Sequence, residues 1–311
     1  MRVGRNCWRA FLLFCHKLMR KLWPKGQPKG ANMSGKLLLI ILDGVPLRNF
    51  TRLFGNLEGW VEAGVAQRFV HRAPLPSISA SCYATIHSGL PPQVHGCTGN
   101  GNVFHLGVPD IFSQARQAGK VTGAVAHSFW STFFNRAPFD VVRDIEYDEP
   151  DSASINHGRF HTMTGYGADN QMTPCDLDLF ASLTNLCARF DLDYGLLHTC
   201  TLDSMGHRFF HESQQMDHAC FVMDEMLAPF IPRWQKMGYE VIVTADHGQD
   251  DRGHHGGRGD LQQLTALYYF GPAKGPAQDS EIAQIQLAPT ILSRLGAPIA
   301  DGMQGEVFLR D

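Results

Sequence analysis

The chain has 311 residues, of which 44% are hydrophobic and 18% charged, the composition of an ordinary soluble globular protein. Its net charge of −3 is uneven, because residues 1–35 contain eight basic residues and no acidic one, which leaves 19 basic and 30 acidic residues on the remainder. An acidic body argues against a protein that binds nucleic-acid duplexes. Eight cysteines without a C-x-x-C pair predict reduced thiols in a cytoplasmic protein, and the lack of any run of about 18 uncharged apolar residues argues against a transmembrane span.

Residues 1–34 differ in composition from the rest and predict an N-terminal extension with a linker. Apolar residues recur at helical spacing over 8–22 among Arg and Lys, and a stretch rich in Pro and Gly follows. Three interpretations are open: residues 1–23 could lie as a basic amphipathic helix on an anionic membrane, they could be a signal peptide, or translation could start at Met33. Charged side chains within the apolar stretch argue against the signal peptide, and we favour the start at Met33.

From Lys36 onward, buried strands alternate with helices. Strands are expected at Leu37–Leu42, Val121–Ala126, Leu192–Thr199, 239–245 and Leu264–Phe270. Helices are expected at Leu53–Ala63, Ile111–Ala118, Gln214–Ile231 and Leu287–Leu295. This alternation predicts an α/β fold with a mainly parallel central sheet and helices on both faces. We expect residues 35–311 to form one catalytic domain, in which the polar region Asp144–Thr173 is a lid over the site or a plain surface loop.

Acidic residues and histidines follow three of the predicted strands, at the ends where parallel sheets bind ligands. They are Asp43 after the first strand, Asp203 and His207 after the strand ending at Thr199, and Asp246, His247 and His255 after the strand 239–245. The i, i+4 spacing of Asp203 and His207 puts both on one face of a helical turn. Six such ligands would suit two zinc ions with positions left open for a substrate. Taken singly, each of these residues could equally be a helix cap or part of a polar loop. Asp250, Asp251 and His254 lie in the same loop as His255 and are further candidates.

The segment Pro76–Gly96 is a candidate nucleophile segment. Small hydroxyl residues gather there at a predicted loop-to-helix turn, where backbone N–H groups can receive an anion. Spacing alone leaves Ser77, Ser79 and Ser81 open, and a Ser-rich helix cap is the structural alternative.

These motifs together resemble the alkaline phosphatase superfamily, and within it the type I phosphodiesterase/nucleotide pyrophosphatase family. The resemblance extends from about Lys36 to Val307. It rests on a strand ending in D-G, the segment Pro76–Gly96, a D-x-x-x-H motif, a D-H-G motif, a further H-G pair and a closing A-P-T…L-G segment. It implies an alkaline-phosphatase-like fold.

The resemblance also implies a role for each site residue. The nucleophile falls on Ser79, ten residues before Gly89, and the phosphoryl-binding Asn falls on Asn100. One metal ion would be held by Asp43, Asp246 and His247 together with Ser79, and the other by Asp203, His207 and His255. His255 is preferred to His254 because the family's ligand directly precedes Gly, which leaves Asp250, Asp251 and His254 outside the ligand set.

The implied activity is hydrolysis of a phosphate ester, a phosphodiester or a nucleotide pyrophosphate, through a phosphoserine intermediate. The implied cofactors are two divalent ions, zinc with manganese as the alternative, and the implied partner is a small phosphate ester or nucleotide. Three departures leave the substrate class open. Ser79 replaces the family's Thr, Ala-Ser-Cys replaces its Phe-Pro-Asn, and only seven residues separate His247 from His255, where the larger nucleotide pyrophosphatases carry a long insertion. Alternatives are a phosphomonoesterase, a phosphonate hydrolase, a sulfatase, a phosphomutase and a non-catalytic phosphate-binding relative.

Overall fold

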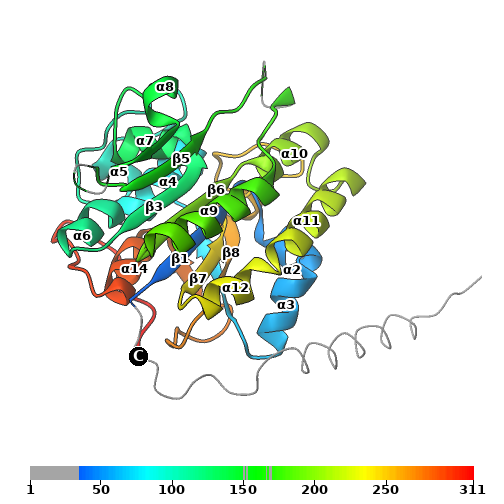
Figure 1. The fold of residues 1–311 in the computed structure, drawn as a ribbon. Coiled ribbons are helices and arrows are strands. Elements are labelled where there is room, and N and C mark those ends of the chain that lie inside the picture. Colours follow the sequence, from blue (N-terminus) through cyan, green and yellow to red (C-terminus); the bar gives the residue numbers. More distant parts are fainter. Residues whose placement is uncertain (1–34, 150, 152, 166, 168–169) are drawn as a thin grey trace, which may run out of the picture. The chain divides into compact units, whose positions relative to one another are not determined.

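The apolar run Leu37–Leu42 forms strand β1 near the middle of a nine-stranded sheet in the computed structural model, which describes residues 35–149, 151, 153–165, 167 and 170–311 (Figure 1). Across these residues the strand order is β4-β5-β3-β6-β1-β7-β8-β2-β9. The other strands are β2 (Gln67–Arg72), β3 (Thr122–His127), β4 (Glu146–Asp148), β5 (His157–His161), β6 (Tyr194–Thr199), β7 (Glu240–Thr244), β8 (Leu264–Phe270) and β9 (Glu281–Ala283).

Parallel pairing dominates the middle of the sheet. β1 pairs in parallel with β6 and β7, and β3 pairs in parallel with β5 and β6. Antiparallel pairs join β7 to β8, β8 to β2 and β4 to β5. The predicted mainly parallel α/β sheet is therefore confirmed, with antiparallel strands towards both edges.

Helices cover both faces of the sheet. They are α2 (Leu47–Leu53), α3 (Gly55–Glu62), α4 (Ser79–Ser88), α5 (Pro92–His95), α6 (Ile111–Gln117), α7 (Ser128–Phe134), α8 (Val141–Asp144), α9 (Asp176–Phe190), α10 (Thr201–Phe209), α11 (Gln214–Leu227), α12 (Phe230–Lys236), α13 (Asp260–Gln263), the 3₁₀ helix η2 (Gln284–Gln286) and α14 (Leu287–Leu295).

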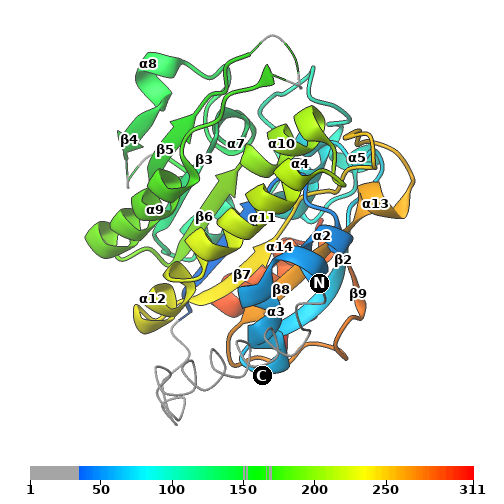
Figure 2. The ribbon, with the colours of Figure 1, turned by 90° about the vertical axis from the view of Figure 1, so that its right-hand side faces the viewer.

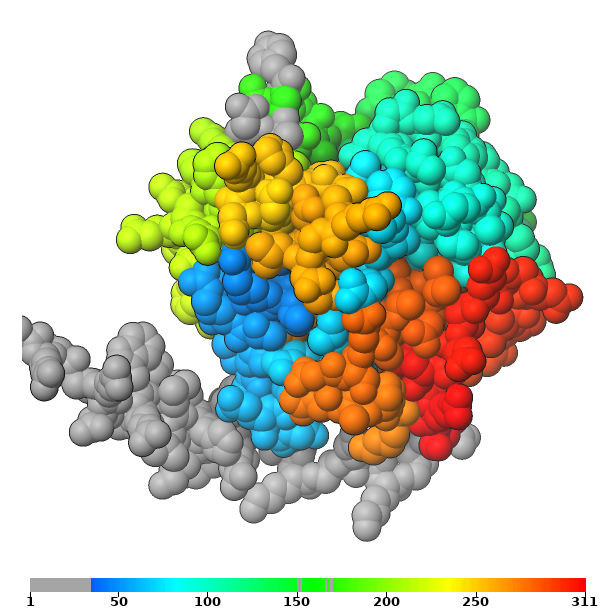
Figure 3. Space-filling view, turned by 180° about the vertical axis from the view of Figure 1, so that it is seen from behind, coloured from blue at the N-terminus to red at the C-terminus, as the bar shows by residue number. Residues whose placement is uncertain are grey.

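Two apolar cores result, one on each face, because successive side chains of a strand point in opposite directions. Leu38, Ile40 and Leu42 of β1 pack with α2, α3, α9, α11 and α12, which lie along one face in Figures 1 and 2. Leu37 and Leu39 pack with α4, α6, α7 and α14 on the other face. In the view from behind (Figure 3), the red C-terminal residues adjoin the cyan-to-turquoise part of the chain. α14 packs against α4 and α6.

The predicted and observed helices differ at two places. The expected helix Leu53–Ala63 corresponds to α3, whereas the separate helix α2 before it was not predicted. The backbone of Phe54 leaves the helical region (φ −91°, ψ 73°) between the two helices. The expected helix Gln214–Ile231 ends at Leu227 and a second helix starts at Phe230, after Pro229, which cannot donate a backbone hydrogen bond. The remaining predicted strands and helices from Lys36 onward start and end within two residues of the observed ones.

The region Asp144–Thr173 contains regular structure that its polar composition did not predict. β5 extends the sheet by pairing in parallel with β3, and β4 closes that edge. The region is therefore in part a sheet edge rather than a loop. The expectations for residues 1–34 lie outside the described residues, and none of the described helices is long and apolar enough to cross a membrane.

Candidate active site

The three predicted ligand segments meet at one edge of the sheet because their strands are neighbours. β6, β1 and β7 lie side by side and run in the same direction, so the residues that follow them emerge together. Asp43 follows β1, Asp246 and His247 follow β7, and α10 begins directly after β6 and carries Asp203.

Asp43, Asp246 and His247, called the inner group below, bring three ligand atoms together. His247 Nε2 lies 3.6 Å from Asp43 Oδ1 and 3.2 Å from Asp246 Oδ2. All three side chains are buried. Their ligand atoms lie within 4.8 Å of one another, which is compact enough to surround one metal ion.

The hydrogen bonds of the inner group leave one oxygen of each carboxylate free. Asp43 Oδ2 accepts hydrogen bonds from the Tyr83 hydroxyl and from His198 Nε2 at 3.0 Å, whereas Asp43 Oδ1 has no hydrogen-bond partner. Asp246 Oδ1 accepts from Gly44 N at 3.2 Å, whereas its Oδ2 has no partner. Buried carboxylate oxygens without a partner are costly, and a cation between them would remove that cost. The inner group therefore fits a divalent metal ion.

Asp203, His207 and His255, called the outer group below, are more open to solvent. Asp203 and His207 both lie on α10, and His207 Nε2 is 3.3 Å from Asp203 Oδ2. The ring of His255 stacks on that of His247 at 4.2 Å and lies 5.1 Å from that of His207. Ligand atoms of Asp203, His247 and His255 lie within 4.8 Å of one another, so His247 adjoins both groups. The side chain of His254, by contrast, is 70% exposed and turns to Asp250.

Burial and mutual repulsion shift the pKa values of the carboxylates. Burial, followed by the charge of Asp203, raises the pKa of Asp43 to about 6. Burial, followed by the charges of Asp43 and Asp203, holds the pKa of Asp246 well above its usual range. Burial also raises the pKa of Asp203, but the hydrogen bond and charge of His207 outweigh it, so this pKa is lowered. Three carboxylates in one buried place need positive charge nearby to ionise together.

Imidazole Nε2 of His247 is available as a ligand. Burial, followed by the charge of His255, lowers the pKa of His247 to about 4, so the ring is neutral at pH 7. Its Nδ1 lies 3.1 Å from the backbone carbonyl of Gly248, which orients the ring with Nε2 towards the two aspartates. Neutral imidazole is the form that binds metal ions.

Ser79 is the first residue of α4 and lies beside the inner group. Its Oγ is 3.0 Å from His247 Nε2, and the residue is 7% exposed. Asn100 lies at the same helix end, because its Oδ1 accepts a hydrogen bond of 3.0 Å from Ala80 N. The other serines of the segment lie differently: Ser77 Oγ donates to Gly257 O at 3.0 Å, and Ser81 Oγ is buried without a partner.

Gly44 allows the inner and outer groups to approach each other. Its backbone has φ +75°, in the left-handed region that favours glycine. A Cβ at this position would lie 2.6 Å from Asp203 Oδ1 and 2.8 Å from Asp203 Cα. The D-G pair after β1 thus positions one carboxylate and makes room for another.

Four residues of this region were not predicted from the sequence. Tyr83 and His198 contact Asp43, Cys200 lies 3.8 Å from His198 Nδ1, and Gln249 donates to Asp203. Asp43, His198 and Cys200 form a third set of ligand-type atoms within 4.8 Å. The only sequence feature that could have pointed to His198 is its position as a histidine inside the buried strand Y-G-L-L-H-T.

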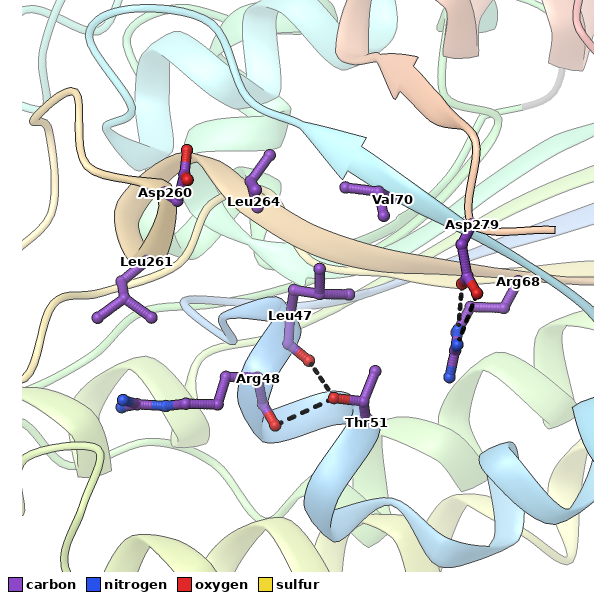
Figure 4. Close-up of a pocket in the computed structure, with 9 residues that line it drawn as sticks. All are labelled: Leu47, Arg48, Thr51, Arg68, Val70, Asp260, Leu261, Leu264 and Asp279. Atoms are coloured by element: carbon purple, nitrogen blue, oxygen red, sulfur yellow. Dashed lines mark hydrogen bonds and ion pairs between the residues drawn. The ribbon is translucent and has the colours of Figure 1, made fainter. Parts of the chain in front are cut away.

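A surface hollow of about 410 Å³ lies elsewhere (Figure 4). Its apolar lining includes Leu47 and Leu264, and its charged side chains are paired, as in the bond of 2.7 Å from Arg68 Nε to Asp279 Oδ1. None of its lining residues belongs to the inner or outer group. The hollow is therefore not the site at the strand ends.

A sequence profile described as type I phosphodiesterase / nucleotide pyrophosphatase matches residues 37–256. The catalytic subunit of human GPI ethanolamine phosphate transferase 3 is 29% identical over 121 residues, which are 37% of this chain and 11% of that protein. The 2,3-bisphosphoglycerate-independent phosphoglycerate mutase of Salinibacter ruber is 31% identical over 124 residues, 38% of this chain and 23% of that protein. The match thus spans between a tenth and a quarter of the length of these two curated relatives.

Solved structures share the fold over most of the described chain. Human ectonucleotide pyrophosphatase / phosphodiesterase 5 superposes with a TM-score of 0.63 at 13% identity and covers 87% of this chain and 97% of that chain. The alkaline phosphatase PafA superposes with a TM-score of 0.62 at 10% identity and covers 90% and 99%. The predicted alkaline-phosphatase-like fold is confirmed.

Proposed function

Because the chain belongs to the type I phosphodiesterase / nucleotide pyrophosphatase family, we propose that it hydrolyses a phosphate ester through a covalent phosphoserine at Ser79. A phosphodiester or a nucleotide pyrophosphate is the substrate class that the family's description favours. The observation that carries the proposal is the distance of 3.0 Å between Ser79 Oγ and His247 Nε2. This distance puts a hydroxyl next to the inner group and at the start of a ten-residue helix, where backbone N–H groups favour an anion.

Two divalent cations fit the site. We assign one to the inner group with Ser79 and the other to the outer group, and zinc suits these nitrogen and oxygen donors, with manganese as the alternative. Such cations lower the pKa of a hydroxyl and neutralise charge on phosphoryl oxygens.

The residues of the chain then act in two steps. Ser79 Oγ bonds to phosphorus while the bond from phosphorus to the leaving alcohol breaks, and the alcohol departs with a proton. Water next attacks the phosphoserine, the bond from Oγ to phosphorus breaks, and the serine hydroxyl is restored. The side-chain amide of Asn100 is tied to Ala80 N through Oδ1, which leaves its N–H groups to donate to the phosphoryl oxygens together with the backbone N–H of Ser79.

A substrate panel tests the reaction class. Purified zinc-loaded protein is assayed with p-nitrophenyl phosphate, a bis-p-nitrophenyl diester, p-nitrophenyl sulfate and a p-nitrophenyl phosphonate. We expect the highest kcat/KM on the diester. Preference for another compound would indicate a monoesterase, a sulfatase or a phosphonate hydrolase instead, and no turnover with stoichiometric zinc would indicate a binding protein.

Ser79→Ala tests the nucleophile. We expect kcat to fall on the order of 10³-fold or more while two zinc ions per chain remain bound. The matched control is Ser81→Ala, which removes a buried hydroxyl from the same helix and should keep its activity. Retained activity in Ser79→Ala would exclude Ser79 as the nucleophile.

Transfer to an alcohol is the second candidate, favoured by the names of the relatives. Four GPI ethanolamine phosphate transferases, from human, mouse, Schizosaccharomyces pombe and Candida albicans, match segments of this chain at 27–30% identity. A transferase would pass the group on Ser79 to an alcohol rather than to water. Turnover of the diester with and without added ethanolamine or glycerol separates the two, because a new phosphodiester forms only in transfer.

A further inference from the structure

We propose that His198 and Gln249 are positioning residues, each of which holds one oxygen of a site carboxylate so that its other oxygen faces a cation. His198 acts on Asp43 of the inner group, and Gln249 acts on Asp203 of the outer group. This inference rests on the proposed two-cation site.

For Asp43, the two carboxylate oxygens have opposite environments. His198 Nε2 lies 3.0 Å from Oδ2, and the Tyr83 hydroxyl donates to the same oxygen. Oδ1 has no partner and is the oxygen that lies 3.6 Å from His247 Nε2. Two donors on one oxygen fix the rotation of the carboxylate, so a single oxygen is presented to the cation.

The orientation of His198 is fixed in turn. An ionised carboxylate only accepts, so Nε2 of His198 carries the hydrogen and Nδ1 of the neutral ring accepts. The group facing Nδ1 is the thiol of Cys200, at 3.8 Å, which can donate S–H. The sulfur then accepts from His161 Nε2, at 4.0 Å. These groups are buried, and they form a chain of hydrogen bonds from the end of β5 across β6 to Asp43.

This assignment also explains the third set of ligand-type atoms. Asp43, His198 and Cys200 lie within 4.8 Å, as ligands of an additional ion would. The same atoms are, however, already paired with each other as donors and acceptors. We therefore assign them to the support of the inner cation and not to an ion of their own.

Gln249 plays the equivalent role for Asp203. Its Nε2 donates to the Asp203 side-chain Oδ1 and, at 3.2 Å, to the Asp203 backbone carbonyl. Its Oε1 accepts from His211 Nε2 at 2.8 Å, which fixes the direction of the amide. Oδ2, the oxygen left over, lies 3.3 Å from His207 Nε2.

Gly206 makes room for this arrangement. A Cβ at position 206 would lie 2.5 Å from His211 Nε2 and would meet Gln249 Oε1 at a still shorter distance. Gln249 and His211 are both fully buried. The second group of contacts is therefore built into the core beneath α10, as the first is built into the sheet.

The test measures the zinc affinity of the whole chain by competition with a chelator in two background variants. Asp203→Asn should retain only the inner cation, and Asp246→Asn should retain only the outer one. His198→Leu should weaken zinc binding about 10- to 100-fold in the Asp203→Asn background and leave it unchanged in the Asp246→Asn background. Gln249→Leu should do the reverse. His198→Gln, which can return an N–H to Asp43, should recover most of the affinity.

Matched controls exclude a general loss of folding. His87→Leu removes another fully buried imidazole, bonded to the Tyr194 hydroxyl at 2.8 Å, and Gln263→Leu removes a buried amide that donates to Ala73 O at 3.0 Å. Both should lower Tm without changing zinc affinity. Equal weakening of both cations by His198→Leu, or an equal effect of the controls, would overturn the inference.

Two further outcomes separate this inference from the proposed function. Three zinc ions bound by the wild type, with one lost in Cys200→Ala, would make Cys200 a ligand and overturn the positioning role while leaving the hydrolase proposal in place. No zinc bound by the wild type would remove both.

Discussion

The inner and outer groups have similar ligands but are built differently. Asp43, Asp246 and His247 directly follow strands whose positions are fixed by parallel hydrogen bonding, and they are 3%, 0% and 0% exposed. Asp203 and His207 lie on a helix, and His255 lies in a loop with a half-buried side chain. The difference teaches that the sheet would set the position of one proposed cation, whereas a helix and a loop would set that of the other. We expect the inner cation to be bound more rigidly than the outer one.

The largest expected effect comes from removing one ligand of each group. Asp246→Asn and Asp203→Asn should each lower kcat/KM on the order of 10³-fold, because charge on the phosphoryl oxygens is then poorly neutralised. Zinc content should fall to one per chain in both variants. Two zinc ions in either variant, measured by elemental analysis, would argue against that ligand assignment.

The second largest effect is expected in the rate at which a chelator removes zinc from the inner and outer groups. With excess chelator, we expect zinc to leave the wild type in two phases whose rates differ about 10- to 100-fold, the fast phase coming from the outer group. His207→Ala should abolish the fast phase, since this outer position then holds little zinc. His254→Ala is the control, because its side chain is 70% exposed and should not alter either phase. A single phase in the wild type would remove the proposed difference in rigidity.

A smaller effect is expected in the metal-free protein. The raised pKa of Asp246 means that the folded state holds its proton more strongly than the unfolded state does, so stability falls as pH rises above about 4. Asp246→Asn should therefore stabilise the metal-free protein at pH 7, and the gain should vanish below about pH 4. Asp203→Asn should have the opposite sign, because the pKa of Asp203 is lowered by His207. Urea unfolding at several pH values measures both.

The smallest effect is expected at the surface hollow. Thr51→Ala removes hydroxyl contacts to the carbonyls of Leu47 and Arg48 within α2 and touches neither group. We expect kcat/KM to stay within about twofold and stability within about 0.5 kcal/mol. A large change in KM would show that the hollow takes part in substrate binding.

The sequence predicted the candidate metal ligands better than the residues that hydrogen-bond to those ligands. Asp43 and Asp246 come after apolar runs, at the carboxyl ends of strands, where α/β sheets bind their ligands. His198 gave no such signal, because a histidine inside the strand β6 is more often a structural residue of the core. Its role depends on Asp43, which follows β1 and is 155 residues away in the chain.

The errors in the fold also have local causes. The helix α2 was not predicted because it is only seven residues long and lies directly before α3, from which only Phe54 separates it. β5, with the sequence H-G-R-F-H, lacks the apolar run of the central strands because it lies near the edge of the sheet, beside the polar β4. Pairing with a neighbouring strand, rather than its own composition, makes it a strand.

Gly44 gives the distance between the two groups a backbone origin. Because Asp203 Cα would lie 2.8 Å from any Cβ at position 44, the helix that carries the outer group rests directly on the main chain that carries the inner group. The separation of the two proposed cations would therefore depend on this close approach of Asp203 to the main chain at Gly44. Gly44→Ala would add one methyl group at this contact and push Asp203 away from Asp43. It would thereby change the distance that a bridging phosphoryl group must span, without removing any ligand.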